Sequence, residues 1–188
     1  RATVTENGWS FFDRSRTSAE ITLDLYRNIL EAAEGKAYIL ACNCVSHLCA
    51  GLAHINRIGD DTSGYNWDIT RNRGVNTLAF RLPQHNAFYA VDADCIGVIP
   101  GRIDWKYNRR WLHLLAHSGT PLFLSSARSS KSSFDFEEMK EAFRLSSLQE
   151  DSCEPLDWMT NNIPSKWRIN GEIINFDWYL PQGIEFHY

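Results

Sequence analysis

The sequence predicts an α/β fold assembled from parallel strand–helix units. Segments with strand and helix character alternate along most of the chain, and several strand candidates end in polar or acidic residues. A length of 188 residues with 44% hydrophobic and 22% charged content is typical of a folded chain with a real core. Alternation of this kind favours parallel βα units. Functional residues at strand C-termini suit either a (β/α)8 barrel or a doubly wound sheet.

The first unit begins with a helix signal. The pattern Thr17-Ser18-Ala19-Glu20 is a capping box, and apolar residues follow it at helical spacing until Gly35, where the helix should stop. Residues 36–42 then form an apolar segment that predicts a buried strand. The polar residue Asn43 stands at its tip.

The second unit has a short helix at residues 46–53 and a strand at residues 54–58. This strand leads directly into Gly59-Asp60-Asp61-Thr62-Ser63-Gly64, which has the composition of a loop. Adjacent side chains on an extended segment point to opposite sides, so Asp60 and Asp61 should not form a catalytic pair with each other. By residue type alone, the loop could be a turn, a helix cap or a calcium-binding loop.

The third unit starts with residues 67–82, a stretch whose pattern leaves helix and strand both open. Residues 87–91 are predicted as a strand that ends in Asp92 and Asp94. Two positions apart on a strand, these carboxylates lie on the same side. They could bind sugar hydroxyls, bind a divalent cation or cap the next helix.

The fourth unit is a helix capped by Asp104 and ended by Gly119, with Trp111 on its inner side, followed by a strand at residues 120–125. A serine-rich linker and a helix near residues 135–147 come next. Residues 167–176 then predict a β-hairpin with an Asn-Gly turn. Four strands are counted before this tail, whereas a barrel of about 250 residues needs eight.

Charge and composition exclude several partners. The net charge is -4 and no stripe of Lys or Arg occurs, so we expect no nucleic-acid partner. No apolar stretch approaches the ~20 residues needed to cross a bilayer, so we expect no membrane contact. The five cysteines are odd in number and mostly lie in apolar runs, which predicts reduced, buried thiols and favours a reducing compartment such as the cytoplasm. Cys42, Cys44, His47 and Cys49 lack a second pair at zinc spacing, so neither metal nor cofactor is predicted.

Three segments resemble clan D glycoside hydrolases, families 27 and 36, which include the α-galactosidases and the melibiase-like proteins. Arg57-Ile58-Gly59-Asp60-Asp61 is similar to their Arg-x-x-x-Asp motif. Residues 90–96 resemble their Trp-Asn-Asp-Pro-Asp-Met segment, and residues 105–125 resemble the helix and Ala-Pro-Leu-Phe-Met-Ser strand that follow. The likeness runs from about Thr17 to Ser126 in matching order.

The resemblance implies a fold and a set of roles. It implies the C-terminal half of a (β/α)8 barrel at residues 1–150, with residues 151–188 starting a small β domain. Asp61 would be the general acid/base of a retaining α-glycosidase acting on terminal α-galactosides. Substrate binding would fall to Arg57, Asn43, Asp92, Asp94 and Cys95. Of these, Asn43 stands where the family reads the C2 substituent of the sugar, while Ala93 and Cys95 depart from the family's Pro and Met.

The family nucleophile, the Asp of a Lys-x-Asp motif, has no counterpart in the sequence. The chain also begins at Arg1 without Met, which suggests missing upstream sequence. We therefore expect the isolated chain to be inactive and to pair with an N-terminal barrel half or with itself, since a half-barrel exposes two sheet edges. The alternatives are a non-catalytic carbohydrate-binding or accessory half-barrel, and a cation-dependent hydrolase using Asp60, Asp92 and Asp94.

Overall fold

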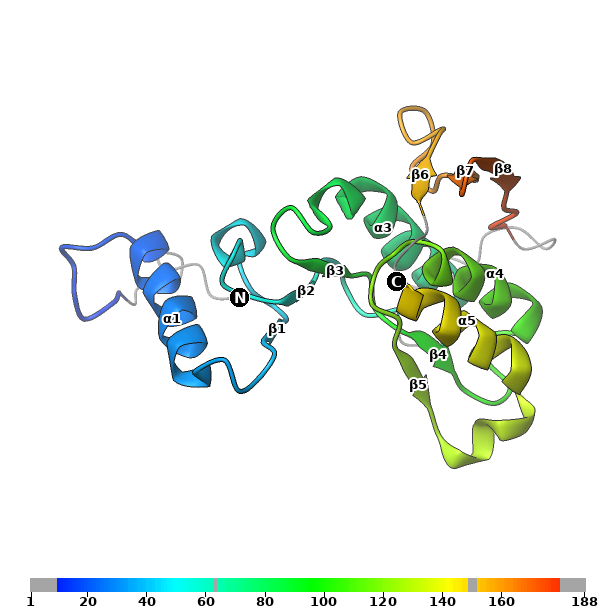
Figure 1. Cartoon of the computed structure of the whole chain (residues 1–188), viewed down its shortest axis with the longest axis horizontal. Helices are drawn as coiled ribbons and strands as arrows, with labels where there is room; N and C mark the ends of the chain where they lie inside the picture. Colours follow the sequence, from blue (N-terminus) through cyan, green and yellow to red (C-terminus); the bar gives the residue numbers. More distant parts are fainter. Residues whose placement is uncertain (1–9, 63, 149–151, 180–188) are drawn as a thin grey trace.

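Helix α1 (Ser18–Ala33) begins at the predicted capping box. The Thr17 hydroxyl accepts a hydrogen bond from the Glu20 amide (3.2 Å), and the Glu20 carboxylate accepts one from the Thr17 amide (2.7 Å). The helix ends at Glu34 in the left-handed conformation, directly before Gly35. The apolar residues at helical spacing, Leu23, Tyr26, Leu30 and Ala33, are only partly buried, and none of the helix residues is fully buried. In the computed structural model, which describes residues 10–62, 64–148 and 152–179, α1 lies at one end of the molecule (Figure 1).

The first sheet contains three parallel strands in the order β1 (Leu40–Ala41), β2 (Ile55–Arg57) and β3 (Ala90–Asp92). Parallel pairing confirms the predicted βα organisation. The predicted buried strand at residues 36–42 is wrong in extent and in burial. Only two residues pair, Leu40 is 43% exposed and Tyr38 is 85% exposed. The exposure follows from the place of β1 at the edge of the described sheet, where it pairs only with β2. A 3-10 helix, η1 (Ser46–Cys49), connects β1 to β2.

The second sheet pairs β4 (Ile96–Val98) with β5 (Leu124–Ser126), again in parallel. The sequence did not predict β4, which is fully buried. The strand predicted at residues 87–91 starts late, because Asn86 adopts a left-handed conformation and closes a turn back to the Tyr89 carbonyl. The strand predicted at residues 120–125 also starts late. Pro121 has no amide proton to donate to a ladder, and pairing begins at Leu124.

The helices cover this framework. The stretch that the sequence left open is helical: α2 (Trp67–Thr70), the π-helical turn η2 (Arg71–Val75), α3 (Asn76–Arg81) and the 3-10 turn η3 (Leu82–Gln84). Helix α4 (Trp105–Ala116) is capped by Asp104 as predicted, and it packs beside α5 (Phe136–Leu148) (Figure 1). The serine-rich linker contains the 3-10 helix η4 (Arg128–Ser132).

The tail forms an antiparallel sheet of β6 (Cys153–Pro155), β7 (Lys166–Ile169) and β8 (Glu172–Asn175). The predicted hairpin is confirmed, because Asn170 (φ 50°) and Gly171 (φ 85°) form its turn. A type I′ turn requires positive φ at both central positions, which Asn-Gly tolerates best. The sequence did not predict β6. The indole nitrogens of Trp167 and Trp178 both donate to the Pro164 carbonyl at 2.7 Å.

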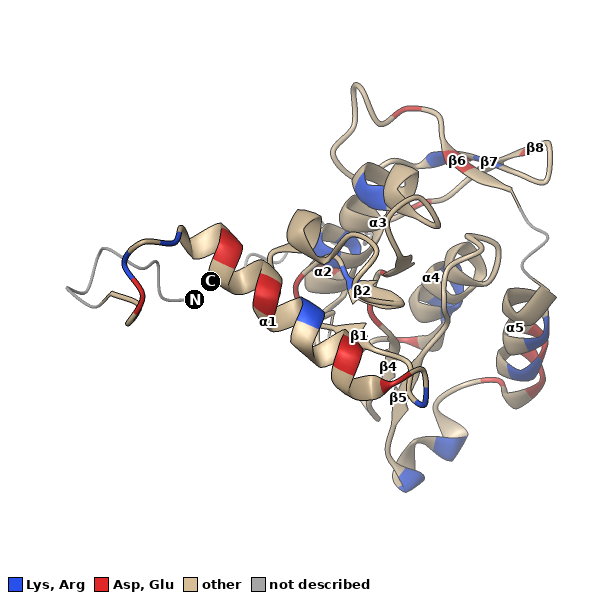
Figure 2. Cartoon of the chain, turned by 60° about the vertical axis from the view of Figure 1, so that its left-hand side comes forward, with Lys and Arg blue, Asp and Glu red and all other residues tan. Residues whose placement is uncertain are grey.

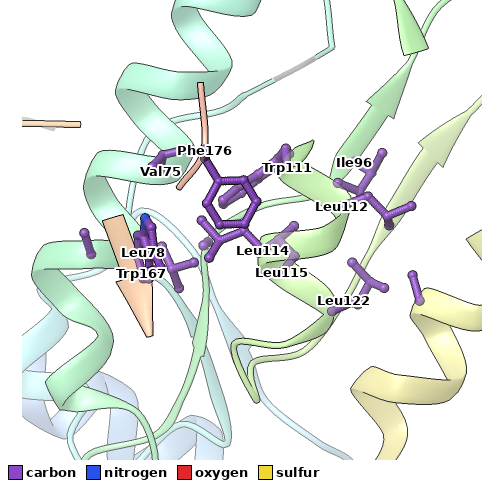
Figure 3. Close-up of a cluster of buried hydrophobic side chains, with 14 of the residues drawn as sticks. Val75, Leu78, Ile96, Trp111, Leu112, Leu114, Leu115, Leu122, Trp167 and Phe176 are labelled. Carbon is purple, nitrogen blue, oxygen red and sulfur yellow. The ribbon is translucent and has the colours of Figure 1, made fainter. Parts of the chain in front are cut away.

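Tail and helices share one buried core, shown in Figure 3. Val75 and Leu78 approach it from η2 and α3, and Trp167 and Phe176 approach it from the tail. Helix α4 contributes the largest set: Tyr107, Trp111, Leu112, Leu114, Leu115 and Ala116. The fold is therefore mixed α/β with small parallel sheets, and the described residues form no closed barrel.

Two surface properties bear on partners. Within the described residues, no helix combines the length and the apolar character needed to cross a membrane. Helix α1 carries mainly acidic residues with Arg27 among them, whereas acidic and basic residues are interspersed along α5 (Figure 2).

Candidate functional site

The candidate site lies at the carboxyl ends of β2 and β3. Because these strands run parallel and in register, Arg57, the last residue of β2, lies beside Asp92, the last residue of β3. The loop carrying Asp61 follows β2, and Asp94 follows β3 two residues later. The structure thus brings together four of the residues singled out in the sequence: Arg57, Asp61, Asp92 and Asp94.

The guanidinium of Arg57 is the centre of this group and contacts three carboxylates. Its Nε donates to Asp92 Oδ2 at 2.9 Å, its Nη2 lies 3.0 Å from Asp94 Oδ1, and its Nη1 donates to Asp61 Oδ1 at 3.2 Å. Burial alone lowers the pKa of Arg57. The hydrogen bond to Asp92 and the charges of Asp92 and Asp94 outweigh burial, so the net pKa lies above its ordinary value. Arg57 is therefore a permanent cation.

Asp92 and Asp94 are the buried members of the group, with side chains 0% and 6% exposed. Their remaining oxygens are also engaged. Asp92 Oδ1 accepts from the Asp94 amide at 2.8 Å, and Asp94 Oδ2 accepts from the Thr62 amide at 2.6 Å. All four carboxylate oxygens therefore have partners within the protein. These two buried carboxylates fix the position of the Arg57 guanidinium.

Asp61 differs sharply from them, because its side chain is 80% exposed. Its carboxylate contacts Arg57 through one oxygen, and its backbone carbonyl accepts from Arg73 Nη1 at 3.3 Å. The Asp61 carboxylate is therefore open to solvent, whereas those of Asp92 and Asp94 are enclosed by the protein.

The remaining predicted site residues lie at the margin of the group. Asn43 follows β1 at the same sheet edge, is exposed and has a positive φ of 55°, and it takes no part in the Arg57 network. Cys95 follows Asp94 and is partly buried. Burial, together with the nearby Asp94 carboxylate, raises the pKa of the Cys95 thiol to about 12. The thiol is protonated at neutral pH and is a poor nucleophile.

None of the five cysteines is in a disulfide bond, and the prediction that they are buried is wrong for most of them. Only Cys49 is buried, and Cys42 is exposed at the end of the β1 segment. Cys44 donates to the side-chain oxygen of the buried Asn56 at 3.1 Å. The apolar run that suggested burial belongs to an edge strand, so one of its sides faces outward.

The arrangement gives no support to a cation site. Among the described residues, no group of three or more His, Cys, Asp or Glu side chains is placed to hold a metal ion. At the most acidic point, between Asp92 and Asp94, the position that a cation would take is filled by the guanidinium of Arg57.

Sequence reasoning missed Thr62 and Arg73, which contact the site from the loop and from η2. Thr62 is fully buried and bonds to Asp94, 32 residues away. No local pattern carries that information, because it depends on the approach of two loops at one sheet edge.

A separate hollow of about 650 Å³ lies between α4 and α5, with an apolar floor that includes Leu112, Ala142 and Phe176. Its rim is charged, and Arg109 there pairs with Glu138. No residue of the Arg57 group lines this hollow, so it is distinct from the candidate site.

Comparison with known proteins gives no family assignment: no protein-family model matches the chain, and no curated protein matches it.

Proposed function

We propose that this chain is part of a retaining α-glycosidase of the α-galactosidase kind, in which Asp61 is the general acid/base and Arg57 contacts the substrate. The observation that carries the proposal is the contrast within the Arg57 group. Asp61 is 80% exposed at a strand's carboxyl end, while Asp92 and Asp94 are buried and fix the guanidinium. The Arg-x-x-x-Asp spacing from Arg57 to Asp61 adds to this support.

The proposed mechanism is a double displacement. A carboxylate nucleophile attacks the anomeric carbon while Asp61 protonates the departing oxygen, and Asp61 then deprotonates the water that hydrolyses the glycosyl-enzyme. The two carboxyl groups must lie about 5 to 5.5 Å apart for retention. Asp92 and Asp94 are too buried to attack a sugar, so the nucleophile comes from outside the Arg57 group.

The partner that supplies the nucleophile would be an N-terminal barrel half or a second copy of the chain. The arrangement of the strands is compatible with a half-barrel. Only three residues, 93–95, separate β3, the last strand of the first sheet, from β4, the first strand of the second. If β3 and β4 together count as one strand, the order along the two sheets is β1, β2, β3 with β4, and β5. That order is the one in which successive barrel strands lie. Among the described strands only β2 pairs with β1, so the other side of β1 is one edge at which pairing could continue.

Mutation of Asp61 tests the proposal, with its exposed neighbour Asp60 as a matched control. The assay uses the chain together with the polypeptide that completes the site and follows release of nitrophenol from a nitrophenyl α-galactoside. Asp61→Asn should lower kcat at least about 100-fold, in the range for loss of a general acid/base. Asp60→Asn should stay within a few-fold of the parent.

The leaving group sharpens the test. A sugar or alkyl alkoxide needs a proton as it departs, whereas a dinitrophenolate needs little help. Asp61→Asn should therefore slow bond cleavage much more for the alkyl or sugar glycoside than for the dinitrophenyl glycoside. Equal losses with both substrates would remove Asp61 from the acid role. Hydrolysis by the isolated 188-residue chain would show instead that the nucleophile lies within it.

A carbohydrate-binding or accessory role is the second candidate. It is favoured by the internal engagement of Asp92 and Asp94, because no second exposed carboxylate contacts Arg57 within the described residues. In that case Asp61→Asn would leave galactoside affinity intact, and no assembly of the chain would hydrolyse the sugar.

A further inference from the structure

The loop that carries Asp61, described at residues 59–62 and 64, contacts the segment after β3, strand β4 and the helical turn η2. Three kinds of contact hold it: hydrogen bonds from Thr62, a backbone approach at Gly64 and a hydrogen bond from Arg73. Each lies outside the carboxylate of Asp61 itself.

Thr62 makes the strongest of these contacts. Its amide donates to Asp94 Oδ2 at 2.6 Å, and its hydroxyl lies 3.1 Å from the same oxygen and 3.2 Å from the Cys95 carbonyl. The residue is 0% exposed. A hydrogen bond to a buried carboxylate is charge-assisted and stronger than a neutral one. Thr62 is thereby bound to a group that Arg57 also holds.

The neighbouring packing leaves the loop little freedom. A Cβ added to Gly64 would stand 2.5 Å from the Gly97 backbone, so the two backbone segments can approach this closely only because residue 64 is glycine. Gly64 also adopts a φ of 72°, which glycine tolerates best. The methyl group of Thr62 lies against Gly74, where an added Cβ would be 3.2 Å away. The loop therefore packs against β4 through Gly64 and against η2 through Thr62.

We propose that Thr62 is a positioning residue for Asp61, acting through Asp94. One peptide unit joins Asp61 to Thr62: its amide is bonded to Asp94, and its carbonyl is bonded to Arg73. The backbone of Asp61 is thus held at both ends of this peptide unit, while its carboxylate stays exposed beside Arg57. This inference rests on the acid/base role proposed for Asp61. It also gives Asp94 a role in placing the loop rather than in gripping a sugar hydroxyl.

Such placement matters because catalytic groups act within narrow tolerances. A displacement of about 1 Å can lower a rate about 100-fold. A precise site also depends on residues whose own conformations are locked by neighbours. The Asp94 carboxylate binds both Thr62, the neighbour of Asp61, and Arg57, the cation that contacts Asp61. One carboxylate therefore fixes the positions of both.

The test separates the hydroxyl of Thr62 from its size. Thr62→Val keeps the shape but removes the hydroxyl, and Thr62→Ser keeps the hydroxyl. A third variant, Asp94→Asn, weakens the acceptor and keeps the proposal testable if Thr62→Val folds poorly. Hydrogen exchange followed by NMR on the 188-residue chain reports loop opening directly. The amides of β7 and β8 serve as the internal control for folding.

We expect the Thr62 amide, which is bonded to Asp94, to exchange about tenfold faster in Thr62→Val and in Asp94→Asn, because a hydrogen bond to a charged group is lost or weakened. Its exchange should change less than about threefold in Thr62→Ser, and the amides of β7 and β8 should not change. Unchanged loop exchange in both Thr62→Val and Asp94→Asn would overturn the proposal, whatever the chain catalyses.

Kinetics on the hydrolysing assembly then test the link to catalysis. Thr62→Val should lower kcat about tenfold or more with KM within about twofold, and Thr62→Ser should restore most of the rate. An unchanged kcat despite a loosened loop would overturn the positioning role. If no assembly hydrolyses a galactoside, the proposed function fails, while the exchange experiment still decides whether Thr62 fixes Asp61.

Discussion

Helices α1 and α4 have similar sequence patterns, yet α4 is built into the core and α1 is not. Each begins with a side-chain cap and carries an apolar face. Helix α4 buries seven of its twelve residues, whereas α1 buries none of its sixteen. An amphipathic pattern shows which side of a helix should pack, but not whether the chain supplies a surface for it. The difference predicts that global stability depends on α4 and that α1 can open locally.

The largest effect should come from Trp111, the fully buried centre of α4. Trp111→Ala removes a large side chain from the core and should lower the free energy of unfolding by about 3–5 kcal/mol. The matched change on α1, Ile29→Ala, removes a side chain that is 43% exposed and should cost less than about 1 kcal/mol. Urea unfolding of both variants measures the difference. Similar losses would show that α1 contributes to the core after all.

A milder substitution shows how much of the cost of Trp111→Ala is lost volume. Trp111 Nε1 is buried without a hydrogen-bond partner in the described structure. Trp111→Phe removes this unpaired donor and keeps an aromatic ring, so it should cost clearly less than Trp111→Ala. A cost equal to that of alanine would mean that the indole nitrogen contributes to stability.

Removing the cap of α4 should lower the global stability more than removing the cap of α1. Asp104→Ala at the start of α4 removes an acceptor for the Lys106 amide (3.0 Å) and should lower global stability by about 1 kcal/mol. Thr17→Ala removes the capping box of α1, but its effect should stay local. Hydrogen exchange should show faster opening of α1 amides, with the urea midpoint almost unchanged. A shift of the midpoint as large as that of Asp104→Ala would contradict the comparison.

Acid should act on α4 through the same cap. The hydrogen bond from the Lys106 amide lowers the pKa of Asp104 in the folded protein. For a carboxyl with a depressed pKa, the stabilisation is present above its unfolded pKa of about 3.9 and is lost as the pH falls through the lower folded value. Asp104→Asn keeps a capping side chain that does not titrate. Its stability should therefore fall less steeply than that of the parent below about pH 4, which urea midpoints at pH 7 and pH 3 would show.

Local signals in the sequence predicted a good part of this fold. The capping box at Thr17, the cap at Asp104 and the Asn170-Gly171 turn each depend on residues within four positions, and each was found where expected. Strand lengths were overestimated because they depend on pairing partners. Apolar residues at positions 36–42 and 87–91 read as strand, but the ladder reaches only part of each.

The candidate site divides in the same way. The spacing of Asp92 and Asp94 predicted that both would face one side, and Arg57 contacts both. Their internal role could not be predicted, because it follows from the register that places Arg57 opposite Asp92 and from the approach of Thr62 to Asp94. Both depend on contacts across more than 30 residues.

The smallest effect on the stability of the chain, and a test of its partners, should come from the outer face of α1. Leu25 and Ile29 lie one turn apart and are 55% and 43% exposed. Replacing both by Ser should change unfolding by about 1 kcal/mol or less. If α1 is covered in the assembled protein, by a second copy or by the other barrel half, the same change removes two apolar anchors. Association should then weaken at least about tenfold, since each buried aliphatic side chain contributes about 1.5–3 kcal/mol.

Sedimentation equilibrium over a range of concentrations, with and without the completing polypeptide, measures that association. Glu31→Ser is the matched control, because Glu31 is exposed on the opposite side of α1 from Leu25 and Ile29. Association that weakens in the double variant and not in the control would show that α1 is buried in the assembly, as α4 is buried within the chain. Association that weakens in neither would leave the outer edge of β1 as the contact to test, because no strand of the described part of the chain pairs there and a strand could bind that edge without any contribution from α1.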